Sequence, residues 1–143
     1  MNELARVSLE GTGVTRTIPD GRALVLVIED EISAQQRQEA HALVGRRVDD
    51  PGLHFDLVAV AEVGRFAFWP ARKFVLAAVR KTEALESTTV WLDWSDALAT
   101  GLALRRGETA FVVVDATGVI MFQAQGLLDE AQRAALDAAI AAL

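Results

Sequence analysis

The densest group of side chains able to do chemistry follows the most apolar run of the chain, residues 23–28. Residues 29–31 read Glu-Asp-Glu, and Ser33 and Gln36 come shortly after them. Carboxylate oxygens are the ligands that hard divalent cations prefer, so one interpretation is a recognition loop or a weak cation site. The other is helix capping, because Ser33 and Gln36 have capping-box spacing and acidic residues are favourable near the positive end of a helix. Capping is the favoured interpretation, and recognition of a partner or ligand is the leading functional alternative.

The chain contains no cysteine. Thiol-disulfide exchange, thiol peroxidase chemistry and cysteine-ligated zinc are therefore excluded. Nucleophilic serine needs an adjacent base and oxyanion donors. His41 lies about two helical turns past Ser33, His54 falls in a predicted strand, and there is no Gly-x-Ser-x-Gly motif. We expect no catalytic residue, no metal site and no cofactor, and the sequence favours a protein that is not an enzyme.

Four basic side chains recur along one predicted helix and are compatible with a shared face: Arg72, Lys73, Arg80 and Lys81. Such a patch would attract an anion, an acidic partner or nucleic acid. The formal net charge of −6 argues against nonspecific binding to nucleic acid or anionic membranes, because both depend on excess positive charge. A solvated helix face is the favoured interpretation, and nucleic acid is disfavoured.

Aromatic residues gather in the middle of the chain, and most of them are expected in the core. Phe68, Trp69 and Trp94 are predicted to form a partly exposed patch. Tryptophan is enriched at interfaces, because its ring is apolar while its N–H needs a partner. The patch therefore predicts a homodimer contact, which a monomeric mass in solution would contradict.

Apolar runs and turn signals predict an alternation of strands and helices. Residues 7–17 are predicted as an edge strand or hairpin. The other predicted elements, in chain order, are a strand at 23–28, a helix at 33–47, a strand at 53–60, a helix at 66–85, a strand at 88–92, a short helix at 96–104, strands at 109–114 and 119–124, and a last helix from 129 to 143. In the last helix Asp129 and Gln132 have capping-box spacing, and Leu136 and Ile140 share its apolar face.

Strands separated by helices form parallel crossovers, whereas the tight turn at 115–118 joins an antiparallel hairpin. The sequence thus predicts one α/β domain over 1–143, with a mixed sheet between helices. Residues 1–17 are its N-terminal edge strand or hairpin extension.

Several segments resemble the thioredoxin-like superfamily. Residues 18–27 (IPDGRALVLV) resemble the turn and first core strand of peroxiredoxin-like and TlpA-like proteins. Residues 109–126 (TAFVVVDATGVIMFQAQG) resemble their terminal hairpin, 127–143 their last helix, and 91–93 (WLD) a strand that often ends in Asp. The resemblance implies a three-layer α/β/α sandwich whose mixed sheet ends in a β-hairpin and a C-terminal helix. Its motifs are structural, so they indicate fold better than activity.

Within that superfamily the sequence is most similar to the YtfJ-like family of uncharacterised bacterial proteins. The similar features are a Ser-Ala helix start at 32–40, a basic stretch at 72–75 and a hairpin entry at 108–115. Ser33 and Gln36 stand near the two cysteine positions of thioredoxins, and Glu108 stands near the position of their cis-proline.

The resemblance implies that the rim where thioredoxins hold substrate is kept without redox chemistry. We define the rim by its residues: Glu29, Asp30, Glu31, Ser33, Gln36, Glu108 and Thr109. The leading prediction is a non-redox interaction module that holds a protein or peptide there. One alternative is a small-ligand binder or non-thiol enzyme at the same rim, and another is a regulatory protein that contacts nucleic acid through the basic helix.

The first residues are polar, and no apolar run approaches the length of a membrane span. The sequence as written predicts a cytoplasmic protein with no membrane partner, or a periplasmic one if the chain continues upstream.

Overall fold

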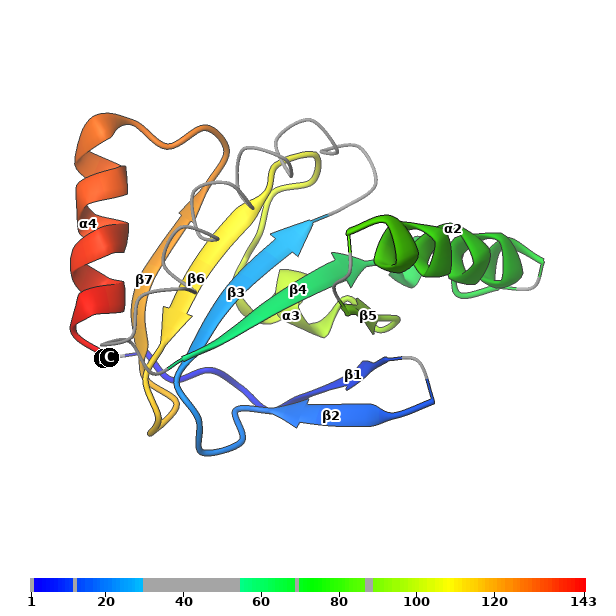
Figure 1. Cartoon of the computed structure of the whole chain (residues 1–143), viewed down its shortest axis with the longest axis horizontal. Helices are drawn as coiled ribbons and strands as arrows, with labels where there is room; N and C mark the ends of the chain where they lie inside the picture. The colour runs from blue at the N-terminus through cyan, green and yellow to red at the C-terminus, as the bar shows by residue number, and fades with distance from the viewer. Residues whose placement is uncertain (1, 12, 30–54, 69, 87–88) are drawn as a thin grey trace.

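The computed structural model of the chain describes residues 2–11, 13–29, 55–68, 70–86 and 89–143. They form a seven-stranded mixed sheet in the order β2-β1-β5-β4-β3-β6-β7 (Figure 1). The strands are β1 Val7–Glu10, β2 Thr15–Ile18, β3 Leu24–Glu29, β4 Asp56–Glu62, β5 Val90–Asp93, β6 Ala110–Val114 and β7 Ile120–Gln125. The described helices are the 3₁₀ turn η2 Gly64–Phe66, α2 Ala71–Glu86, α3 Ala97–Gly101 and α4 Glu130–Ala141.

β3 lies in the interior of the sheet, between β4 and β6, and all six of its residues are buried. A continuous apolar run is typical of a strand that is covered on both faces. β3 pairs parallel with β4 and antiparallel with β6, and β4 in turn pairs parallel with β5. β6 and β7 form the terminal hairpin. The predicted combination of parallel crossovers with an antiparallel hairpin is confirmed.

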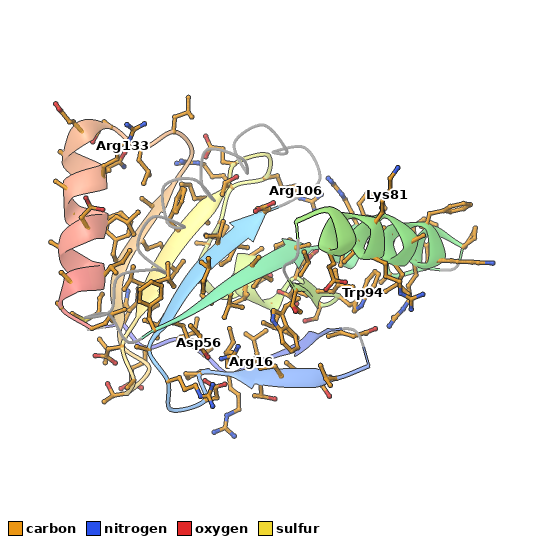
Figure 2. The ribbon with its side chains drawn as sticks, in the orientation of Figure 1. Arg16, Asp56, Lys81, Trp94, Arg106 and Arg133 are labelled. Atoms are coloured by element: carbon orange, nitrogen blue, oxygen red, sulfur yellow. The ribbon has the colours of Figure 1, made fainter. Side chains whose placement is uncertain are left out.

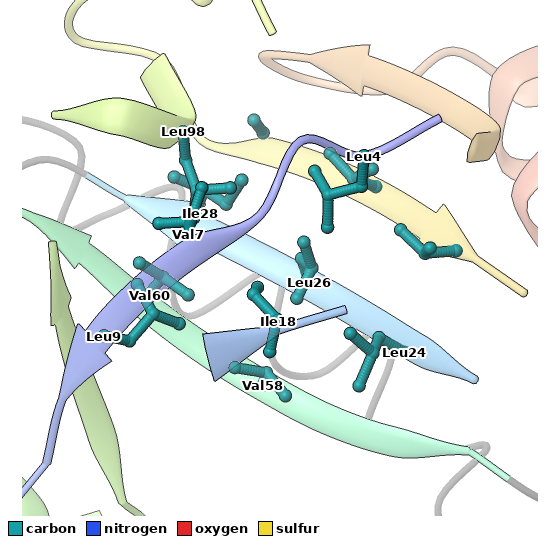
Figure 3. Packing of buried hydrophobic residues seen from close by; sticks show 13 residues of the cluster. Leu4, Val7, Leu9, Ile18, Leu24, Leu26, Ile28, Val58, Val60 and Leu98 are labelled. Carbon is teal, nitrogen blue, oxygen red and sulfur yellow. The ribbon is translucent and has the colours of Figure 1, made fainter. Parts of the chain in front are cut away.

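Two apolar cores lie on opposite faces of this sheet. Leu24, Leu26 and Ile28 of β3 enter one core, and Val25 and Val27 enter the other, as expected from the alternation of side chains along a strand. The first core is covered by the β1–β2 hairpin and by α3, whose buried side chains meet those of β3 and β4 (Figure 3). The second is covered by α4, which lies against β6 and β7 (Figure 1).

Some predicted boundaries were wrong, each for a local reason. The strand predicted at 53–60 is β4, which continues to Glu62 because β3 offers it a parallel partner up to Glu29. The helix predicted at 66–85 is α2, which begins only at Ala71, directly after Pro70, because a proline without a backbone N–H is tolerated at the start of a helix but not in its interior. The short helix predicted at 96–104 is only Ala97–Gly101, and Ala103 adopts a left-handed conformation with φ 54°. The helix predicted at 33–47 lies outside the described residues.

Among the described residues, none of the helices combines the length and the apolar character that a bilayer span requires.

The capping box at the start of α4 is confirmed, and it supports a prediction about stability. The Asp129 carboxylate accepts the Gln132 backbone N–H at 2.7 Å, and the Gln132 side chain accepts the Asp129 N–H at 3.0 Å. We expect Asp129→Ala to lower the free energy of unfolding by about 1 kcal/mol, because the first turn loses its acceptor. Asp129→Asn is the control, since it keeps an acceptor at the same position. Chemical denaturation measures both variants, and equal losses would show that the cap is not the cause.

Candidate functional site

The three parallel strands of the sheet each end on an acidic residue. β3 ends on Glu29, β4 on Glu62 and β5 on Asp93. Parallel pairing brings these ends to one edge, and the register places Glu62 directly beside Asp93. Ligands of open α/β sheets bind outside the carboxyl ends of the strands. This edge of the sheet is therefore the candidate ligand-binding site.

Asp93 has a structural task at this edge. Its side chain is fully buried, and its Oδ2 accepts the Leu98 backbone N–H at 2.9 Å. Its Oδ1 accepts the Ser95 hydroxyl at 3.0 Å. Asp93 thereby holds the start of α3 against the end of β5.

Asp96 is held close to the backbone at the other side of the edge. It adopts a left-handed conformation with φ 52°, and its Oδ1 accepts the Gly64 N–H at 3.0 Å. The absence of a side chain at Gly64 makes this approach possible, because an added Cβ would meet both Asp96 oxygens at 2.7 Å or less. The turn after β4 and the residue before α3 are thus fastened together.

Glu62 lies between these two aspartates. Burial, and after it the neighbouring Asp93 and Asp96, together raise the pKa of Glu62 to about 10. Both Glu62 carboxyl oxygens are buried, and no donor among the described residues reaches them. A proton on Glu62 lets this carboxyl donate a hydrogen bond towards the aspartates instead of opposing them with a third negative charge. Glu62 is therefore neutral at physiological pH.

A cavity of about 300 Å³ opens at this edge, and we call it the edge cavity. Its charged lining residues are Glu29, Glu62, Arg65, Asp96, Arg105, Arg106 and Glu108, and its other lining residues are Ile28, Ala99, Thr100 and Leu104. Glu29 is only 8% exposed, whereas Arg105 and Arg106 are exposed on the outer side. Arg106 lies in the segment before β6, near the end of β3 (Figure 2).

The structure brings two predicted rim residues, Glu29 and Glu108, to the edge cavity. Glu108 accepts the Arg105 Nε–H at 2.7 Å. Thr109 is buried, and its carbonyl accepts the Gly126 N–H at 2.9 Å, so its backbone ties the start of β6 to the end of β7. The other predicted rim residues, Asp30, Glu31, Ser33 and Gln36, lie outside the described residues.

Sequence reasoning missed most of the edge cavity. The charged lining residues that were not assigned to the rim are Glu62, Arg65, Asp96, Arg105 and Arg106. One signal was available, because the apolar runs that form β3, β4 and β5 all stop at a carboxylate. Parallel strands that end alike in sequence place those ends together in space.

Among the described residues, no group of three His, Asp or Glu side chains is arranged to hold a metal ion.

The basic residues of α2 have different surroundings. Arg72 forms an ion pair with Glu10 at 3.0 Å, and its guanidinium stacks 4.4 Å from the centre of the Trp94 ring. Lys73, Arg80 and Lys81 are exposed. Lys81 lies nine residues from Arg72, which is half a turn around a helix with 3.6 residues per turn, so these two side chains point to opposite sides.

The residues of the predicted aromatic patch likewise have different surroundings. Phe68 is 63% exposed, whereas Trp94 is half-buried beneath the Arg72 guanidinium, between α2 and β1 (Figure 2). Trp69 lies outside the described residues. The homodimer contact stays a prediction.

Arg72 is expected to stabilise the packing of α2 against β1. Arg72→Ala removes a partly exposed ion pair and a cation–π contact, so we expect the free energy of unfolding to fall by about 1 kcal/mol. Lys73→Ala is the matched control on the same helix and should change stability by less than about 0.5 kcal/mol. Thermal unfolding followed by circular dichroism compares the two, and equal effects would contradict the role of the Arg72 contacts.

No family model matches the sequence, and no curated protein matches it either. Solved structures do match. The chain is similar to a Chlorobium tepidum protein assigned as the thiol:disulfide interchange protein DsbE, with a TM-score of 0.72 and 17% identity over 99% of this chain and 94% of that one. It is also similar to the pneumococcal exposed lipoprotein thioredoxin Etrx1 from Streptococcus pneumoniae (TM-score 0.66, 15% identity, 97% and 100% covered). A third match is StoA from Bacillus subtilis (TM-score 0.62, 14% identity, 92% and 96% covered).

These similarities confirm the predicted thioredoxin-like α/β fold. At this level of identity they show the fold alone. The neighbours include thiol-disulfide oxidoreductases by their names, and this chain has no cysteine with which to perform that chemistry.

Proposed function

We propose that this chain is a non-redox binding protein of the thioredoxin fold that holds a peptide segment of a partner protein in the edge cavity. The observation that carries the proposal is the position of this cavity, at the carboxyl ends of three parallel strands. Open α/β sheets bind their ligands there. The lack of cysteine removes the thiol reaction but leaves the binding surface in place.

A peptide suits the lining better than an apolar molecule does. Among the described lining residues, charged side chains of both signs outnumber the others. Such a lining offers donors and acceptors to a polar main chain and to charged side chains, whereas sites for drug-like molecules are mostly apolar. The likeness to YtfJ-like proteins belongs to the same proposal, because that family also has Ser-Ala where thioredoxins have cysteines.

The test is a peptide array probed with the purified chain. Thr100 is exposed on α3 and lines the edge cavity, so Thr100→Trp would fill it. Ala116→Trp adds the same bulk at the exposed β6–β7 turn and serves as the control. The proposal expects a set of peptides that the wild type and Ala116→Trp bind and that Thr100→Trp does not. Binding that Thr100→Trp retains would place the peptide elsewhere and overturn the proposal.

The Glu62 carboxyl favours a second candidate, a small-ligand binder or non-thiol enzyme at the same cavity. A carboxyl that stays protonated near neutral pH has the property required of a general acid. A thermal-shift screen of small metabolites tests this candidate. It expects a compound that stabilises the wild type but not Thr100→Trp, and a screen without such a compound would remove it.

A further inference from the structure

We infer that a second binding site, separate from the edge cavity, lies along the outer edge of β7, where an extended segment of a partner protein adds to the sheet as a further strand. The segment carries apolar side chains at alternate positions. In contacts of this kind the main-chain hydrogen bonds give affinity, and pockets for alternate side chains give specificity.

The outer edge of β7 presents unused backbone groups. β7 is the last strand of the sheet and pairs with β6 on one side. Directly after it, Gly126 donates its backbone N–H to the Thr109 carbonyl at 2.9 Å, on the β6 side. Backbone groups of an antiparallel strand alternate between its two sides, so those of Ala124 also face β6, whereas those of Gln123 and Gln125 face outwards. Among the described residues nothing bonds to these two N–H groups and two carbonyls.

The chain itself already adds a strand at the start of this edge. Its first residues form an antiparallel bridge with the residues that lead into β7. Leu4 donates its backbone N–H to the Gly118 carbonyl at 2.8 Å, and Ile120 donates its N–H to the Asn2 carbonyl at 2.9 Å. The bridge shows that the outer side of β7 has the geometry to accept a neighbouring strand.

The rest of the edge lacks the usual protection. Exposed sheet edges are normally protected by charged side chains, by proline or by a short strand. The opposite edge of this sheet follows that rule, because β2 has four residues, contains Arg16 and is followed by Pro19. β7 has six residues, none of them charged and none of them proline. Within it Met121 is 44% exposed. An edge of this kind is suited to receive another strand.

A groove of about 730 Å³ lies beside the same edge, between the N-terminal segment and α3, and we call it the β7 groove. Gln123 lines it and thus joins it to the open part of β7. The large apolar side chains of its lining belong to Leu4, Val7, Leu98, Leu102 and Ile120. Side chains alternate between the two faces of a strand, so an added strand directs every second side chain to the side of the groove. The groove therefore selects segments with alternating apolar residues.

A second copy of this chain fits the β7 groove less well than a partner segment does. Antiparallel pairing of two β7 strands would bring Gln123 and Gln125 of the second copy to the groove. The Gln123 side chain already donates to the Leu102 carbonyl at 2.8 Å. The Gln125 side chain accepts the Arg105 backbone N–H at 2.9 Å. Each copy also has a formal net charge of −6, which disfavours self-association.

The experiment uses two heptapeptides with blocked ends, Lys-Val-Thr-Val-Thr-Val-Lys and Lys-Thr-Thr-Thr-Thr-Thr-Lys. Threonine has nearly the shape of valine, so the two peptides differ in apolar character. Titration of the ¹⁵N-labelled chain, followed by NMR, gives both Kd values. We expect the valine peptide to bind at least about tenfold more tightly, as for burial of one valine side chain. It should also slow the hydrogen exchange of the Gln123 and Gln125 amides.

Three variants separate the edge from the groove. Gln123→Pro removes an outward N–H, which an edge strand tolerates, and should weaken binding of the valine peptide at least about tenfold. Gln123→Ala is its control, because it loses the same side chain but keeps the N–H, and it should bind like the wild type. Gly101 is exposed on α3 and lines the β7 groove, so Gly101→Trp would fill it. This variant should lose the preference for valine over threonine.

Three results would overturn the inference. The first is that neither peptide binds, or that the valine peptide leaves amide exchange at Gln123 and Gln125 unchanged. The second is binding that Thr100→Trp abolishes and Gln123→Pro retains, which would place the valine peptide in the edge cavity. The third is a dimeric mass by light scattering that Gln123→Pro makes monomeric, which would make a second copy the occupant. The proposed function is decided separately, by the array peptides that Thr100→Trp fails to bind.

Discussion

Replacing Glu62 with glutamine is expected to remove much of the pH dependence of this protein's stability and to stabilise it at alkaline pH. The folded chain keeps a proton on Glu62 up to a pKa of about 10, whereas the unfolded chain releases it near the ordinary value of 4.5. Between these values unfolding releases a proton, so stability falls as the pH rises. The slope for one proton is about 1.4 kcal/mol per pH unit. Below the pKa of the unfolded chain Glu62 is protonated in both states, so its contribution to the free energy of unfolding is fully present and no longer changes with pH.

Glutamine imitates the protonated form, because it has the same shape and carries N–H donors towards Asp93 and Asp96. The variant and the wild type should therefore be about equally stable near pH 5 and should diverge as the pH rises. Urea denaturation at pH 5, 7 and 9 measures the difference, with Glu3→Gln as the control at an exposed carboxyl. Parallel stability curves for the wild type and Glu62→Gln would mean that Glu62 is ionised in the folded protein.

The sheet could be predicted because its signals are local. Residues 24–28 and 110–114 are continuous apolar runs of strand length, and the Asp-Ala-Thr-Gly turn between β6 and β7 encodes a hairpin in its own residues. Asp115 accepts the Thr117 hydroxyl and the Val119 and Thr117 N–H groups through its side chain, and these bonds lower its pKa. The Asp129 cap is a second local signal that the structure confirms. Elements of this kind can be predicted without knowing which other elements pack against them.

The edge cavity could not be predicted in the same way, because it depends on register and on backbone conformation. Glu62 meets Asp93 only because β4 and β5 pair in parallel with these residues opposite each other. Asp96 reaches Gly64 only because its backbone adopts a left-handed conformation, and the neighbouring residue types do not predict that conformation. The predicted strand at 53–60 stopped two residues short of Glu62, so the acidic end of β4 was not recognised.

The surroundings of Glu62 lower stability at neutral pH, and this supports a role in binding. A carboxyl group held neutral beside two aspartates makes folding less favourable than a glutamine would. Natural chains break local rules of this kind mainly where they bind or react.

Among substitutions that add a single methyl group, Gly64→Ala is expected to disturb the edge cavity most. The new Cβ would lie 2.7 Å or less from both oxygens of Asp96, so the Asp96 side chain must leave its position. The Gly64 N–H then loses its charged acceptor, which is worth about 1.5–3 kcal/mol. The overpacking adds about 1–3 kcal/mol. We expect the free energy of unfolding, measured by chemical denaturation, to fall by about 3 kcal/mol.

Two comparisons separate this clash from a general effect of replacing glycine. Gly101→Ala lies in α3, with no atom within 4 Å of the added Cβ, so it should be neutral or stabilising by up to about 1 kcal/mol. Asp96→Gly removes the clashing carboxylate and suits the left-handed backbone at that position. If the contact with Asp96 is the cause, Gly64→Ala should be nearly neutral when it is added to Asp96→Gly. A loss of similar size in both backgrounds would show that Gly64 is required for the backbone turn itself rather than for the approach of Asp96.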